Sequence, residues 1–107
     1  MATIALRQGD VLFVRVDTVP EDALLQPRGP RIVVMEGEAT GHAHAIAQTE
    51  TVQHYRDPGL DMQWIVVEEQ AVEVRHEEHQ TVVLPPGIWM IPVQVQVQRK
   101  QVRRVLD

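Results

Sequence analysis

The chain has 107 residues, enough for one domain with a single core. Hydrophobic residues make up 44% and charged residues 23%, which excludes general disorder. There is no cysteine, so disulfides and thiolate metal sites are excluded, and the net charge of -5 argues against a protein that coats nucleic acid. No apolar run approaches the ~20 residues of a membrane helix, and no secretion signal is visible at the start. We therefore expect a cytoplasmic protein that contacts neither membrane nor nucleic acid.

The residues favour strands, because the chain is rich in valine and is divided by proline and glycine. We predict an all-β single domain over residues 1–107, a small barrel or sandwich of about seven to nine short strands. A single helical turn is allowed at Glu21–Leu25. In chain order, the predicted strands are Val11–Val16, Arg31–Met35, His42–Ala47, Glu50–Tyr55, Gln63–Glu68, Ala71–Arg75 and Thr81–Leu84, with Asp57-Pro58-Gly59 as a turn and Glu69-Gln70 as a hairpin tip. The longest strand is predicted after Pro85-Pro86-Gly87, and it includes Trp89 and the alternating Val93–Gln98 segment.

Four of the five histidines form two close pairs. His42 and His44 are two residues apart, so on a strand they project from the same face. His76 and His79 are three apart and converge only if the chain turns between them. Neutral imidazole binds divalent transition metals, and joining two ligand pairs is a common way to assemble a metal site. The pattern predicts one metal ion held by His42, His44, His76 and His79, with zinc or iron expected and manganese or nickel as alternatives.

The two carboxylates between the second pair, Glu77 and Glu78, are candidates for a general base or a further ligand. If one histidine is not a ligand, an open coordination position remains for water or substrate. Four histidine ligands would instead close the shell, as in a structural site. His54 stands alone and is expected to be a surface or packing residue.

An alternative function needs no metal. A non-enzymatic assembly or adaptor module could use a strand edge, which also allows a homodimer, or the basic tail at about residues 99–107 to bind a protein. The alternating Val93–Gln98 segment is the candidate edge, with one apolar face and one glutamine face. The sequence does not name a reaction, so whether the protein is an enzyme stays open.

Four segments carry a resemblance to a group of small bacterial and phage-borne proteins without an assigned activity. They are Gln8-Gly9-Asp10-Val11, Gly37-Glu38-Ala39-Thr40-Gly41-His42-Ala43-His44, His76-Glu77-Glu78-His79 and Leu84-Pro85-Pro86-Gly87. The resemblance extends from Gln8 to about Gln98. It supplies a pattern and implies no particular reaction.

A more distant resemblance is to cupins, small metal-binding β-barrels. Gly37, His42, His44 and Glu50 are similar to their first motif, and Pro85-Pro86-Gly87 is similar to the PxG of their second. The resemblance implies a barrel in which His42, His44 and Glu50 are ligands. No histidine follows Gly87, where a cupin has its last ligand, and the second histidine pair precedes it instead.

Overall fold

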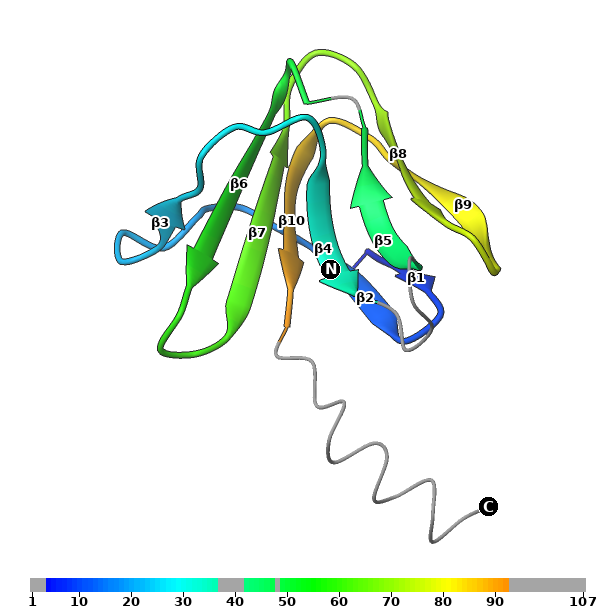
Figure 1. The fold of residues 1–107 in the computed structure, drawn as a ribbon. Helices are drawn as coiled ribbons and strands as arrows, with labels where there is room; N and C mark the ends of the chain where they lie inside the picture. The colour runs from blue at the N-terminus through cyan, green and yellow to red at the C-terminus, as the bar shows by residue number, and fades with distance from the viewer. Residues whose placement is uncertain (1–3, 37–41, 48, 93–107) are drawn as a thin grey trace, which may run out of the picture.

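The computed structural model describes residues 4–36, 42–47 and 49–92, and these residues form ten strands and no helix (Figure 1). None of their segments is therefore a helix that could cross a membrane. In chain order the strands are β1 (Ala5–Gln8), β2 (Val11–Val16), β3 (Leu24–Leu25), β4 (Ile32–Glu36), β5 (Ala43–Ile46), β6 (Val52–Asp57), β7 (Met62–Val67), β8 (Val72–His76), β9 (His79–Leu84) and β10 (Gly87–Ile91).

The strands form two antiparallel sheets. The six-stranded sheet has the order β1-β2-β10-β7-β6-β3, and the four-stranded sheet has the order β4-β5-β8-β9. This confirms the all-β prediction and, of its two architectures, the sandwich, because the two sheets do not close into one barrel. The described residues contain ten strands rather than seven to nine, since β1 and β3 were not predicted. β10 agrees with the strand predicted after Pro85-Pro86-Gly87.

The core lies between the sheets and follows the alternation of the strands. In β2, Val11 and Phe13 are fully buried, and Ile46 of β5 and Val74 of β8 in the other sheet belong to the same buried cluster. Trp89 of β10 is also buried, and its indole N–H donates to the Pro85 carbonyl over 2.9 Å. Each fully buried side chain of this size contributes roughly 1.5–3 kcal/mol of hydrophobic stabilisation.

Two local predictions were wrong. Glu69-Gln70 is not a hairpin tip, because β7 belongs to the six-stranded sheet and β8 to the four-stranded sheet. A two-residue hairpin favours Gly, Asn or Asp at its centre, and Glu69-Gln70 contains none of the three. The segment instead carries the chain from one sheet to the other. Glu21–Leu25 is not a helical turn either, since a turn at residues 21–22 leads directly into β3.

A buried glutamine joins the two sheets on one flank of the sandwich. The Gln63 side chain is 4% exposed, and its Nε2 donates to the Val34 carbonyl of β4 over 2.8 Å. Its Oε1 accepts a hydrogen bond from Nε2 of His54 over 2.7 Å. Burial is the main cause that lowers the pKa of His54 below 6.5, outweighing the hydrogen bond to Gln63. His54 is thus a packing residue, as expected.

We predict that Gln63→Ala destabilises the protein by about 1–3 kcal/mol, because the Val34 carbonyl and the His54 ring lose their partner in a buried place. Urea unfolding monitored by tryptophan fluorescence measures this loss. Gln70→Ala is the matched control, since Gln70 is exposed. Equal stabilities of the two variants would contradict the role given to Gln63.

Candidate metal centre

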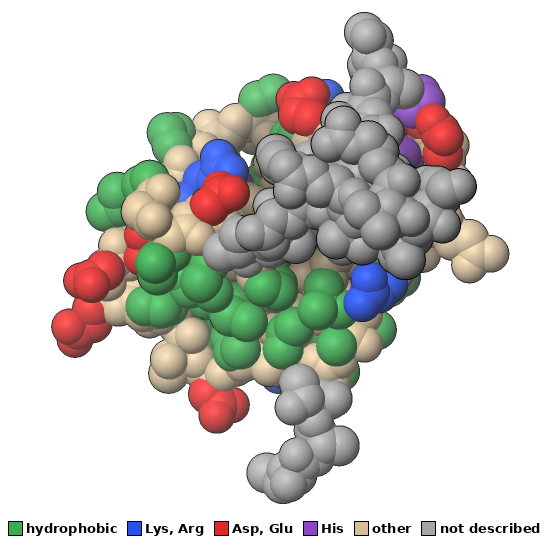
Figure 2. All heavy atoms as spheres, turned by 90° about the horizontal axis from the view of Figure 1, so that it is seen from below, with side chains coloured by type: hydrophobic (Ala, Val, Ile, Leu, Met, Phe, Trp, Pro, Cys, Tyr) green, Lys and Arg blue, Asp and Glu red, His purple; other side chains and the backbone are tan. Residues whose placement is uncertain are grey.

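The four paired histidines come together at one end of the four-stranded sheet. His42 immediately precedes β5 and His44 lies within it, while His76 ends β8 and His79 begins β9. Glu77 and Glu78 form the turn of the β8–β9 hairpin, which makes His76 and His79 direct cross-strand partners. Histidine and acidic side chains therefore lie side by side at one edge of the molecule (Figure 2).

Ring centroid distances describe the cluster. The His76 ring lies 4.3 Å from His44, 4.6 Å from His79 and 5.9 Å from His42. His44 and His79 are 5.8 Å apart with nearly parallel planes. The turn that the prediction required between His76 and His79 is present, and the His42–His44 pair meets the other pair across the sheet.

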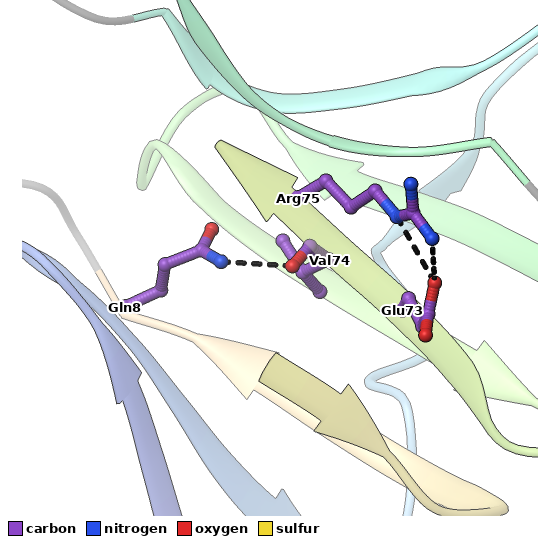
Figure 3. A network of polar contacts seen from close by, with 4 residues as sticks. All are labelled: Gln8, Glu73, Val74 and Arg75. Carbon is purple, nitrogen blue, oxygen red and sulfur yellow. Dashed lines mark hydrogen bonds and ion pairs between the residues drawn. The ribbon is translucent and has the colours of Figure 1, made fainter. Parts of the chain in front are cut away.

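Gln8 fixes the cluster from the other sheet. It is the last residue of β1, is 2% exposed, and its Nε2 donates to the carbonyls of Val74 and Gln80 over 2.8 Å each. Figure 3 shows the Gln8 side chain reaching from β1 to Val74 on β8. The β8–β9 ladder has a register shift between Val74 and His76, and this shift interrupts the regular pairing around both carbonyls.

The same glutamine determines which nitrogen of His44 carries hydrogen. Because both Nε2 hydrogens of Gln8 are used on carbonyls, its Oε1 must be the acceptor toward Nδ1 of His44, 2.8 Å away. The neutral His44 ring therefore has its hydrogen on Nδ1 and a lone pair on Nε2. His44 is 5% exposed, and burial first, then the charges of His76 and His79, lowers its pKa to about 4.

The carboxylates of Glu77 and Glu78 lie against the segment that carries His42 and His44. Oε1 of Glu77 accepts from the Ala43 main-chain N–H over 3.1 Å, and main-chain N–H groups of Glu77 and Ala43 lower the pKa of this carboxyl group. Oε2 of Glu78 lies 2.6 Å from Nδ1 of His42, although Nδ1 has no well-formed hydrogen bond to a described residue. The N–H of Glu78 donates to Nδ1 of His76 over 3.0 Å, so the neutral His76 ring carries its hydrogen on Nε2.

Gly9 leaves the space that His79 occupies. Gly9 and Asp10 form the turn between β1 and β2, and Gly9 has a φ of 58°. A Cβ atom at this position would lie 2.6 Å from Nε2 of His79. Asp10 is close enough for its charge to act on His44, where it opposes the lowering of the pKa.

The rings are gathered but are not yet arranged around an ion. Across residues 4–36, 42–47 and 49–92, no three His, Asp or Glu side chains already have the positions that a shared metal ion requires. The hydrogen bond from the Glu78 N–H to His76 occupies the Nδ1 lone pair of that ring. A metal that binds His76 through Nδ1 has to displace this N–H.

Sequence reasoning named the four histidines and both hairpin carboxylates but did not derive the roles of Gln8 and Gly9. The only available signal was the Gly9-Asp10 dipeptide, which is typical of a two-residue hairpin turn and places Gln8 at the end of the preceding strand. Glu50, which the cupin resemblance implied as a ligand, precedes β6 in the other sheet, and its carbonyl accepts from Arg28 over 2.8 Å. The Val93–Gln98 segment and the basic tail at 99–107 lie outside the described residues.

The fold and site define a small two-sheet β protein with histidines clustered at one end. The chain belongs to the family described as "Domain of unknown function (DUF8820)", whose model matches residues 7–94. This supports the predicted resemblance to a family of small proteins without an assigned activity, whereas the four motifs named for that resemblance stay a prediction. No curated protein and no solved structure matches the chain, so the cupin resemblance stays a prediction.

We predict that Gly9→Ala destabilises the protein and moves the His79 ring. Alanine is strained at a φ of 58°, and its Cβ would collide with the imidazole. The expected loss in free energy of unfolding is about 1–3 kcal/mol, with a changed His79 resonance in the NMR spectrum. Gly59→Ala is the control, because its nearest contact would be 3.4 Å away. An unshifted His79 resonance would contradict this close approach.

We also predict that His44 of the metal-free protein titrates near pH 4. An unfolded histidine takes up its proton near pH 6.5, so the stability from a neutral His44 is fully present above that pH. It is lost as the pH falls from 6.5 toward 4, by about 1–3 kcal/mol in total. NMR titration of the His44 ring, beside urea unfolding at several pH values, tests both parts. A midpoint near 6.5 would contradict the prediction.

Proposed function

We propose that this protein binds one divalent transition metal ion through His42, His44, His76 and His79, with zinc or iron as the expected metal. The observation that carries the proposal is the Gln8–His44 pair. A metal-binding histidine usually donates its other ring N–H to a fixed acceptor, which orients the ring and raises its basicity. Oε1 of Gln8 is such an acceptor, and it leaves Nε2 of His44 with the lone pair that a metal needs.

The surroundings support the same proposal. Four imidazoles occupy one small region, and the carboxylates of Asp10, Glu77 and Glu78 give that region a negative charge that favours a cation. Binding requires a modest change in the β8–β9 turn, where His76 exchanges the Glu78 N–H for the metal. This turn is exposed at Glu77 and Glu78, so it can adjust without disturbing the core.

A bound metal would supply Lewis acidity or an activated water. With three histidine ligands an open position would remain, and Glu78 would be the base that takes up a proton there, because its carboxylate lies against His42. Glu77 is a positioning residue in this proposal, since its carboxylate holds the main-chain N–H of Ala43 beside the first histidine pair.

The test begins with metal-free protein and titrates Zn²⁺ by calorimetry, followed by elemental analysis after dialysis. We expect one Zn²⁺ per chain, and a movement of the Glu78 amide resonance as its bond to His76 is displaced. His44→Ala and His76→Ala should each weaken binding at least about 100-fold, and Gln8→Ala by about 10- to 100-fold.

His54→Ala is the matched control, because His54 is a partly buried histidine bonded to a buried glutamine and makes no ring contact with the cluster. It should bind Zn²⁺ like the wild type. Failure of the wild type to bind Zn²⁺, Fe²⁺, Mn²⁺ or Ni²⁺ would refute the proposal, as would binding that survives His44→Ala unchanged.

The rival function, an assembly or adaptor module, stays a prediction. Its two candidate surfaces were the Val93–Gln98 edge and the tail at 99–107, which the structure does not describe. No observation on the described residues favours it over metal binding.

A further inference from the structure

A groove of about 570 Å³ lies on the outer face of the four-stranded sheet and ends at the histidine cluster. Its floor is formed by Ala43, Ala45 and Ala47, which alternate along and just beyond β5 with the inward-facing His44 and Ile46. The groove exists because none of these three positions has a side chain beyond Cβ. Four residues of extended chain separate Ala43 from Ala47, a distance of about 13 Å.

The walls carry charge, but most of it is already paired. Arg75 donates from Nε and a guanidinium NH₂ group to Oε1 of Glu73, over 3.0 and 2.6 Å. Both side chains extend from β8 on the side away from Gln8 (Figure 3). At the cluster end, Glu77 accepts from the Ala43 N–H. Its carboxylate makes that end of the groove negative.

Arg31 is the other charged side chain of the groove that is not in the Glu73–Arg75 pair. It lines the far end, where the pairing of Ile32 with Ile46 places it next to Ala47. Within the part of the chain that the structure describes, its guanidinium has no hydrogen bond and no salt bridge. The groove is therefore apolar along its floor, negative at the histidine end and positive at the other end. Such a distribution orients a ligand that carries one negative charge at one end.

We propose that this groove binds a linear organic carboxylate, with its chain on the alanine floor and its carboxylate on Arg31. The uncharged end of such a ligand would then lie beside His76 and Glu77, which line the groove and belong to the cluster. That the ligand is a substrate of a metal centre rests on the proposed function, whereas its binding to the groove does not. The ligand class is thus an organic acid of about the length of the floor.

Octanoate is the probe for the test, which records amide NMR spectra of the full chain with and without Zn²⁺. We expect shifts centred on Arg31, Ala45 and Ala47. Acetate lacks the chain and octylammonium has the opposite charge, so neither should shift these amides at the same concentration. Arg31→Gln and Ala45→Leu should each weaken octanoate binding at least about tenfold, the first by removing the charge and the second by filling the groove.

Arg28→Gln is the matched control, because Arg28 is an exposed arginine that lines a different pocket. It should leave octanoate binding unchanged. Octanoate shifts that survive Arg31→Gln, or that fall outside the groove, would overturn the proposal. Zn²⁺ binding without any octanoate shift would overturn it while leaving the metal site intact. Octanoate binding by a protein that takes up no metal would support the groove and refute the metal centre instead.

Discussion

The side-chain amide of Gln8 holds the histidine end of the molecule together. It lies in the six-stranded sheet, yet all three of its hydrogen bonds go to the four-stranded sheet, to the Val74 and Gln80 carbonyls and to the His44 ring. These bonds satisfy buried polar groups at a ladder irregularity, where an unpaired carbonyl would cost about 1–3 kcal/mol. Together with the β5–β8 ladder, they hold one histidine pair against the other.

Gln63 has a corresponding role on the other flank. Each glutamine donates to a main-chain carbonyl of the four-stranded sheet and accepts from a histidine. The hydrophobic core between them is largely valine and isoleucine, whose packing alone tolerates small slips of one sheet over the other. Directional hydrogen bonds at both flanks remove that freedom. The alanine-floored groove benefits as well, since its walls belong to strands whose positions are fixed from behind.

Local patterns predicted much of this structure. Alternation and turn residues placed β2 at its observed bounds and most other strands within two residues, and the spacing of the histidines indicated the cluster. Strand pairing between distant parts of the chain could not be predicted. Glu69-Gln70 has the spacing of a hairpin, although not its preferred residues, and the actual partners of β7 and β8 lie in different sheets. Gln8 was missed for a related reason. A glutamine at a strand end is ordinarily solvated. Gln8 is buried because its side chain bonds to carbonyls that lie 66 and 72 residues later in the sequence.

The two glutamine–histidine pairs differ in one respect that reaches beyond stability. Gln8 meets His44 at Nδ1, whereas Gln63 meets His54 at Nε2, and in both cases the glutamine oxygen accepts. The fold therefore holds two neutral imidazoles in opposite tautomers. A metal ion or an electrophile that attacks ring lone pairs would meet Nε2 at one and Nδ1 at the other. His44 and His54 thus give one example of each neutral tautomer in the same molecule, and the tautomers of the other histidines can be compared with these two.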